Sequence, residues 1–306
     1  MIQPVEMKKK LPMKLHGGVM STTTEVWEML CASRDGDLER AMQLVSQCPE
    51  LSTCQYNYTP PIHFAVREGH LPLVRELVGH GALDPRYKTY PFGDSLLTMA
   101  RDRGHDEIAM FLESTLARPE LTRRLVDTGE IDYRQDEDQV RFDKALHEGN
   151  VHEIESLLRA RPELARNEMS SWAEGVLMMP AKERNRPLLE LLMGFGARVP
   201  EISKWGRFYY FKHDDIAAFL LENGMSPAHR SWQHVTLLHD MAQSGDIAKA
   251  RLLLDHGADI NAVDEEYCST PLGMATRWGQ SEMAAFLLER GADPDKAGAA
   301  WATPEA

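Results

Sequence analysis

The sequence lacks any apolar run long enough to cross a membrane, since a spanning helix needs about 18 such residues. Basic residues are also scarce: 34 Lys and Arg face 47 Asp and Glu, and the net charge of -13 repels phosphate backbones and anionic lipids. We therefore expect neither a nucleic acid nor a membrane as the main partner. Residues 1–20 carry lysines but no apolar segment after them, which argues against a secretory signal.

Cysteine is rare as well. The four cysteines, Cys31, Cys48, Cys54 and Cys268, show no CxxC spacing, and three of them lie in the first fifth of the chain. This pattern favours reduced thiols on small buried side chains over disulfides or metal ligands. Without a secretory or membrane-spanning segment, the chain is predicted to be cytoplasmic.

Recognisable catalytic motifs are missing too. No Ser, Thr or Cys stands in a nucleophile elbow, and no glycine-rich loop could cradle a phosphate. His147 and His152 are five residues apart, whereas a zinc-protease helix needs histidines four apart. The GFGARV segment at 194–199 lacks the strand and third glycine of a dinucleotide fingerprint, and the acidic run at 136–138 lacks the spaced ligands of a calcium loop. We predict no catalytic residue, no cofactor and no metal, and hence not an enzyme.

What the sequence does contain is a repeat. Residues 268–294 resemble residues 234–261 when Gly279 is aligned with Gly245, 34 residues earlier. Residues 58–84 fit the same template. Tracking the middle glycine along the chain indicates eight units, two of them degenerate. The middle positions are Gly36, Gly69, Gly104, Gly149, Arg184, Lys212, Gly245 and Gly279.

Each part of the unit has a physical role. Thr-Pro opens the first helix, because the fixed φ of proline suits a helix start. The middle glycine ends that helix, since glycine adopts the left-handed conformation at little cost. Apolar pairs then line one face of a second helix, as at 73–78, and Gly-Ala-Asp ends it. The pattern predicts all-α helix pairs that must stack on neighbours to bury their apolar faces.

Spacing of the units predicts the domain organisation. The interval of 45 residues between Gly104 and Gly149 indicates an insertion, with a short helix and an acidic loop, that could act as a hinge. The predicted parts are a disordered leader at 1–25, repeats one to three at 26–118, the insertion at 119–139, repeats four to eight at 140–296 with the fifth and sixth degenerate, and a tail at 297–306.

The T-P-L-H-x-A pattern, followed by glycine and then L-L-x-x-G-A-D, resembles the ankyrin repeat, and residues 58–84 and 268–294 match it best. The resemblance implies an all-α solenoid of helix pairs with short hairpin-like loops. It also implies a protein-binding scaffold or adaptor that uses the concave face of the array. We expect a monomer with a protein partner. One alternative is that the repeats regulate or target an enzyme, and another is a self-associating structural role.

Ankyrin repeats commonly contact their partner through the two residues before the middle glycine, and the resemblance carries this role to ten positions. They are Arg67 and Glu68, Asp102 and Arg103, His147 and Glu148, Gln243 and Ser244, and Arg277 and Trp278. Aromatic residues predicted at loop tips are added to them: Tyr56, Tyr87, Trp232 and Tyr267. Trp278 is the first choice, because aromatic residues and arginine dominate the energetics of many interfaces.

Three further features have two interpretations each. His63 and His239 are expected to hydrogen-bond backbone in the adjoining loop rather than to act in catalysis. Asn261 is expected to make a loop hydrogen bond, although some ankyrin repeats present an asparagine for hydroxylation. The aromatic cluster at 205–211 is either a degenerate core or an exposed binding patch.

Overall fold

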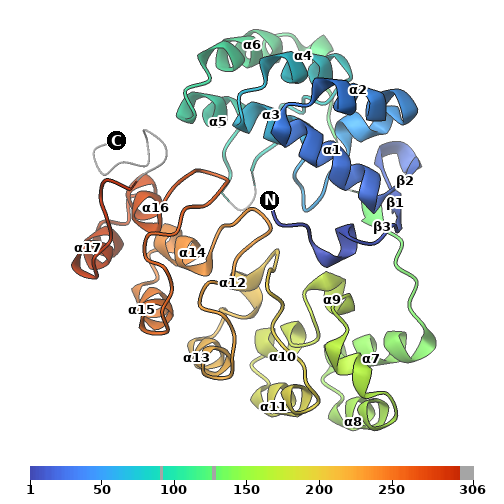
Figure 1. Cartoon of the computed structure of the whole chain (residues 1–306), viewed down its shortest axis with the longest axis vertical. Coiled ribbons are helices and arrows are strands. Elements are labelled where there is room, and N and C mark those ends of the chain that lie inside the picture. The colour runs from blue at the N-terminus through green and yellow to red at the C-terminus, as the bar shows by residue number, and fades with distance from the viewer. Residues whose placement is uncertain (90–91, 126–128, 297–306) are drawn as a thin grey trace. The chain divides into compact units, whose positions relative to one another are not determined.

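The computed structural model describes residues 1–89, 92–125 and 129–296. Its seventeen α-helices within that part of the chain lie mostly in antiparallel pairs, which confirms the predicted all-α fold class (Figure 1). The chain forms two compact units. The N-terminal unit is Glu6–Tyr133, and the C-terminal unit starts at Arg134 and includes Met1–Val5. The predicted tail at 297–306 lies outside the described residues.

The N-terminal unit contains three helix pairs in two layers (Figure 1). The first helix of each pair packs on the first helix of the next, and these three form one layer. The pairs are α1 (Thr23–Asp35) with α2 (Leu38–Gln47), α3 (Pro61–Arg67) with α4 (Leu71–Gly79), and α5 (Leu96–Asp102) with α6 (Asp106–Leu116). Buried side chains such as Leu73, Val74 and Leu77 join the second helices to the first, as the apolar spacing predicts.

The prediction of a disordered leader at 1–25 is wrong. Strand β1 (Pro12–Lys14) pairs antiparallel with β2 (Met20–Thr22) and with β3 (Glu130–Ile131), and two short 3-10 helices, η1 (Val5–Met7) and η2 (His16–Gly18), flank it. Met13 and Leu15 are 1% exposed, so apolar burial holds the segment in place. The sequence signal is weak because the strands are short and β3 comes from the insertion.

As far as residue 296, the C-terminal unit contains five helix pairs and one additional short helix, α9 (Ser170–Ala173). The second helices of the pairs follow one another along one side of the unit (Figure 1). The pairs are α7 (Glu137–Glu148) with α8 (Val151–Ala160), α10 (Met178–Lys182) with α11 (Arg186–Gly194), α12 (Gly206–Tyr209) with α13 (Asp214–Glu222), α14 (Leu237–Ser244) with α15 (Ile247–Asp255), and α16 (Pro271–Arg277) with α17 (Ser281–Glu289).

Proline ends three of the second helices in the same way. Each Pro-Glu-Leu segment forms a short 3-10 helix after the α-helix, because proline cannot continue the α-helical hydrogen bonds. These are η3 (Pro49–Thr53), η4 (Pro119–Leu121) and η5 (Pro162–Arg166). The short helix predicted in the insertion is η4.

Among the described pairs, all except α12–α13 close the turn between their helices with one recurrent hydrogen bond. The residue after the middle position donates its N–H to the carbonyl five residues earlier, as from His70 to Ala65 at 2.8 Å. Asn185 makes the same bond to Pro180, also at 2.8 Å, although the middle residue there is Arg184 with φ +56°. The degenerate unit therefore keeps the turn without the glycine.

Neighbouring pairs are joined by a second recurrent contact. The side chain after the middle position reaches back to a carbonyl two residues before the middle position of the preceding pair. The four contacts are His70 Nε2 to Arg34 O at 2.8 Å, His105 Nε2 to Arg67 O at 3.0 Å, His213 Nε2 to Lys182 O at 3.1 Å, and Gln280 Nε2 to Gln243 O at 3.0 Å. These bonds fix the stacking of one pair on the next.

Candidate partner-binding surface

The residues that precede the turns form a mixed aromatic and charged surface in the C-terminal unit. At the end of α16, the Arg277 guanidinium lies 5.2 Å from the ring centre of Trp278 and 5.5 Å from that of Tyr267. The two rings meet edge to face at 5.6 Å. A guanidinium over an aromatic face keeps its N–H groups in its own plane, where they can still donate to a bound partner. Arg277 and Trp278, which are neighbours in the sequence, thus form one half-buried cluster.

The sequence analysis did not single out Trp172. Among the tryptophans that the structure describes, Trp172 is the only exposed one. Its side chain is 70% exposed, and its φ is +58°. Ser171 at +53° and Ala173 at +60° share this left-handed conformation, which costs about 1–3 kcal/mol for each non-glycine residue. Such strain persists only where the surrounding structure imposes it. No local pattern in the sequence indicates a left-handed turn here.

A buried polar network holds the Trp172 turn in place. The Glu174 carboxylate is 1% exposed and accepts hydrogen bonds from Ser203 Oγ and from the Lys204 N–H at 2.9 Å. The Tyr210 hydroxyl donates to the Glu174 carbonyl, and Lys204 Nζ donates to the Trp172 carbonyl at 2.6 Å. Burial raises the pKa of Tyr210 well above its usual value, so its hydroxyl keeps the proton that it donates.

The aromatic cluster at 205–211 combines both predicted roles. Tyr210 and Phe211 are buried in the core, whereas Phe208 is 43% exposed and Trp205 is half-buried. The Trp205 and Phe208 rings lie 6.3 Å apart. The cluster is therefore split between core and surface within seven residues.

Side-chain contacts tie some of these residues to a neighbouring pair. The His147 ring, at the end of α7, meets the Trp172 ring edge to face at 5.5 Å. Further along, the Arg207 guanidinium lies 5.4 Å from the Phe208 ring and donates to Gln243 Oε1 of α14 at 3.1 Å. We name the exposed and half-buried members of this surface the aromatic band. It consists of Trp172, Trp205, Arg207, Phe208, Arg277 and Trp278.

Several residues predicted to meet a partner are buried, and the prediction of their exposure is wrong. Tyr56 is 4% exposed, with its hydroxyl 2.7 Å from Glu6 Oε1. Arg67 is 1% exposed and lies over the Phe64 ring at 4.9 Å. Trp232 and Tyr267 are 2% and 5% exposed. Their loops fold back onto the helices, so these large side chains fill the core.

The other predicted contact residues have varied positions. His147 and Glu148 are exposed at the end of α7, and Glu148 pairs with Lys144 at 3.8 Å. Tyr87 is half-buried, with its hydroxyl 3.0 Å from His63 Nδ1. The half-buried residues of the N-terminal unit before the turns are Glu68, Asp102 and Arg103.

Two predicted structural roles are confirmed. His239 Nε2 lies 3.0 Å from the Ser269 carbonyl in the adjoining loop, and burial lowers the pKa of this histidine although Asp264 lies 3.9 Å away. Asn261 Oδ1 accepts a hydrogen bond from the Asp293 N–H at 2.9 Å. His63 Nδ1 lies 3.0 Å from the hydroxyl of Tyr87 in the adjoining loop.

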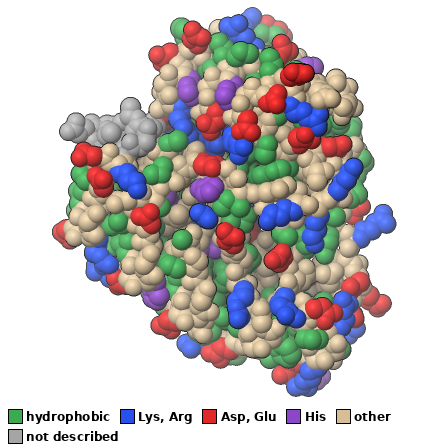
Figure 2. Space-filling model, in the orientation of Figure 1, with side chains coloured by type: hydrophobic (Ala, Val, Ile, Leu, Met, Phe, Trp, Pro, Cys, Tyr) green, Lys and Arg blue, Asp and Glu red, His purple; other side chains and the backbone are tan. Residues whose placement is uncertain are grey.

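All four cysteines carry free thiols, but only Cys54 is buried, whereas the sequence analysis predicted burial for all four. Burial raises the pKa of the Cys54 thiol, which makes a thiolate there unfavourable. Within residues 1–89, 92–125 and 129–296, no group of three or more His, Cys, Asp or Glu is placed to hold a metal ion. Acidic and basic side chains are interspersed over the face seen in Figure 2, with hydrophobic atoms between them.

No helix within the described ranges combines the length and the apolar character that crossing a membrane requires.

Comparison with known families agrees with this geometry. Residues 208–297 match the family described as ankyrin repeats in three copies, and residues 58–90 match a single ankyrin repeat. The chain therefore contains ankyrin repeats, which confirms the resemblance seen in the sequence. The first match includes two pairs with a regular middle glycine and also the aromatic residues from Phe208 onward.

Three relatives illustrate the range of similar proteins. The NF-kappa-B inhibitor cactus of Drosophila melanogaster is 35% identical over 98 residues, or 31% of this chain and 19% of the relative. An ADP-ribosylation factor GTPase-activating protein of Arabidopsis thaliana is 40% identical over 83 residues, or 27% of this chain and 10% of the relative. A probable E3 ubiquitin-protein ligase of Oryza sativa subsp. japonica is 29% identical over 244 residues, or 79% of this chain and 40% of the relative. The chain thus spans less than half the length of each relative.

Proposed function

We propose that this chain is a protein-binding scaffold or adaptor, and not an enzyme, whose partner docks on the aromatic band of the C-terminal unit. The observation that carries the proposal is Trp172, because a strained left-handed turn and a buried polar network hold its side chain 70% exposed. Stability alone would favour burying a tryptophan. A costly arrangement that exposes one supports a binding role.

The chemistry of the band suits a protein partner. Tryptophan, phenylalanine and arginine are enriched at the centres of protein interfaces, where a well-buried anchor contributes about 2 kcal/mol or more. Arg207 and Arg277 stack on aromatic rings, so their side chains lose little further conformational freedom on binding. Ankyrin repeats generally mediate protein–protein interaction, which supports the same conclusion.

The test is affinity capture with paired variants. We expect Arg277→Ala with Trp278→Ala, and separately Trp172→Gly, to weaken partner capture by about tenfold or more. The matched control is Val151→Ala with Arg159→Ala, two exposed residues on α8 in the same unit. Far-UV circular dichroism should stay unchanged in all of them. Equal capture by wild type and both band variants would remove the aromatic band from consideration.

The second candidate function is regulation or targeting of an enzyme. It is favoured by two relatives whose names describe a GTPase-activating protein and a ubiquitin ligase, of which this chain matches 10% and 40%. The test adds the captured partner to the chain and measures the turnover of that partner. A change in the partner's turnover that is lost in Trp172→Gly would support regulation of an enzyme. A turnover that the chain does not change would contradict regulation and favour the adaptor role.

We also propose a cytoplasmic, monomeric protein. The free thiols and the net charge of -13 support this, because excess like charge opposes self-association. Light scattering across a range of protein concentrations tests the monomer, and imaging of the tagged protein in cells tests the location.

A further inference from the structure

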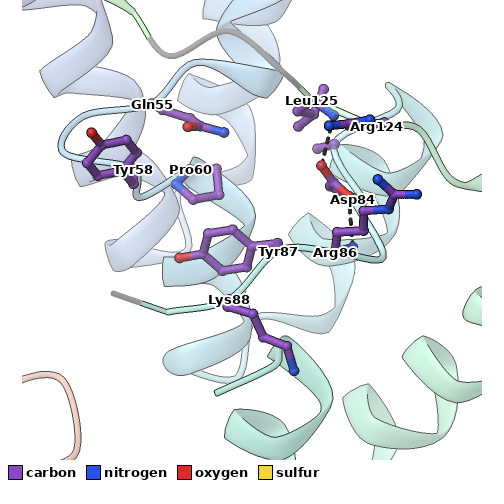
Figure 3. Close-up of a pocket in the computed structure, with 10 residues that line it drawn as sticks. Gln55, Tyr58, Pro60, Asp84, Arg86, Tyr87, Lys88, Arg124 and Leu125 are labelled. Carbon is purple, nitrogen blue, oxygen red and sulfur yellow. Dashed lines mark hydrogen bonds between the residues drawn. The ribbon is translucent and has the colours of Figure 1, made fainter. Parts of the chain in front are cut away.

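A pocket of about 350 Å³ lies among the loops of the N-terminal unit, in a part of the molecule that the aromatic band does not include (Figure 3). At roughly 30 Å³ per water molecule, this volume equals about twelve waters, so an amino-acid side chain fits inside. Three loop segments supply its walls. The residues are Gln55, Tyr58, Pro60, Ala82, Asp84, Arg86, Tyr87, Lys88, Arg124 and Leu125.

Hydrogen bonds from backbone give the pocket a fixed wall. Asp84 accepts from the Arg86 N–H and from the Leu125 N–H, both at 2.8 Å, so each carboxylate oxygen already has a donor. The Arg123 N–H donates to the Leu83 carbonyl at 2.9 Å. The 123–125 segment is therefore tied to the loop after α4, and the wall is formed before any ligand binds.

Gln55 supplies an unused polar group inside this pocket. Its side chain is 9% exposed, and within the described residues its amide has no hydrogen-bond partner. Figure 3 shows the amide pointing into the space between Pro60 and Leu125. An amide that faces a pocket and has no protein partner is available to hydrogen-bond a ligand.

The rim of the pocket is cationic. Arg86, Lys88 and Arg124 are all exposed, and none has a carboxylate within ion-pair distance among the described residues. Against these three positive charges the lining contains one carboxylate, Asp84, which backbone N–H groups already stabilise. The pocket is thus locally positive in a chain whose net charge is -13.

We propose that this pocket binds an acidic peptide segment of a partner protein, with one carboxylate seated against the Gln55 amide. Figure 3 shows Arg86 and Lys88 extending away from the centre of the pocket. A single small anion would require cations that converge on one point. Diverging cations instead suit a longer segment, whose flanking carboxylates meet the rim on either side.

Net charge makes the proposal sharply testable. The whole chain repels an acidic peptide, so only a local cationic site can bind one. Raising the ionic strength from about 0.01 M to about 0.15 M shortens the screening length from about 30 Å to about 8 Å and should weaken binding. The buried Gln55 contact should be less sensitive to salt than the exposed rim.

The experiment titrates fluorescein-labelled poly-glutamate peptide with the full chain and follows fluorescence anisotropy. We expect Arg86→Gln with Lys88→Gln and Arg124→Gln to weaken binding at least about tenfold. Gln55→Met, which keeps the volume but removes the amide, should weaken it severalfold. The matched control removes three exposed cations from the C-terminal unit, with Lys144→Gln, Arg159→Gln and Arg186→Gln, and should bind as wild type does.

Competition identifies the ligand chemistry. Poly-glutamine peptide of the same length should not bind, and inorganic phosphate should not displace poly-glutamate at an equal concentration of anionic groups. Equal binding by the rim triple variant and the control variant would overturn the proposal. Displacement of poly-glutamate by phosphate, or much tighter binding of a phosphoserine peptide, would overturn the proposal that the pocket binds a carboxylate and would indicate a phosphate site. None of these outcomes depends on the aromatic band, so either proposal can fail without the other.

Discussion

The turn between α14 and α15 and the turn between α10 and α11 differ in sequence but not in hydrogen bonding. Gly245 is the middle residue of the first, with φ +72°, and Arg184 is the middle residue of the second, with φ +56°. Both turns close through an N–H to the carbonyl five residues earlier. The comparison shows that stacking against neighbouring pairs can hold a residue other than glycine in a left-handed turn.

The same two regions differ in how they carry strain and buried polarity. Between their two helices, the regular pairs have glycine at the left-handed turn, and residues such as Leu238 and Leu253 fill their seam. Residues 170–212 instead hold several non-glycine residues at positive φ and bury Glu174 and Tyr210. Strain of this kind often marks functional surfaces, and here it lies beside the aromatic band.

The largest effect is expected at a covered glycine. A Cβ on Gly69 would lie 2.7 Å from His105 Cε1, at a φ of +85°, and His105 cannot withdraw without losing its contact with Arg67 O. Gly69→Ala should therefore destabilise the protein by about 2–4 kcal/mol. Gly279, at φ +67°, has no described atom within 4 Å of such a Cβ, so Gly279→Ala should cost about 1 kcal/mol. Urea unfolding measures both, and equal costs would contradict the role of the covering histidine.

The next effect is acid sensitivity of the irregular region. His229 is 2% exposed, its Nε2 has no hydrogen-bond partner within the described residues, and burial lowers its pKa to about 4. The unfolded chain binds the proton near pH 6.5, whereas the folded chain resists it until about pH 4. Stability is therefore lost as the pH falls through this interval, by about 2 kcal/mol. In His229→Asn, the urea midpoint should vary less between these pH values, and an unchanged profile would rule out His229 as the source.

A regular pair should show the opposite pH dependence. Burial raises the pKa of Asp240 on α14 to about 7, although the nearby Arg207 opposes the shift. The folded chain then holds a proton that the unfolded chain loses near pH 4, so stability falls as the pH rises from about 4 to about 7. Asp240→Asn should be more stable than wild type at pH 8 and equal to it at pH 4. Urea unfolding at pH 8 and pH 4 measures this difference. A variant that is more stable than wild type only at pH 4 would contradict a raised pKa of Asp240.

The smallest effect tests the turn comparison directly. Arg184→Gly should relieve the left-handed strain and stabilise the protein by about 0.5–1 kcal/mol, after the loss of the exposed ion pair with Asp215 at 2.9 Å. Asp215→Asn, which breaks the ion pair alone, is the control and should change stability little. Thermal unfolding of both variants measures the difference. A destabilised Arg184→Gly would mean that the arginine contributes more than its conformation costs.

Much of the fold could be predicted from the sequence because each unit contains local signals. Gly36, Gly69 and Gly245 mark left-handed turns that few other residues adopt cheaply, and Pro-Glu-Leu segments mark helix ends. The surface was harder to predict. Arg67 occupies a position that commonly meets a partner, yet its aliphatic stem and guanidinium pack on Phe64 and fill the core.

By itself the sequence determined the number of helix pairs, their turns and the apolar seam, because helix periodicity and glycine caps act over a few neighbouring residues. Only the tertiary structure decided that Met13 pairs with Ile131 in a sheet, that Trp172 is exposed, and that Gln55 faces a pocket. Each of these depends on segments far apart in the chain, or on strain that local preference opposes. Packing between such segments sets burial and exposure, and no pattern along the chain records it.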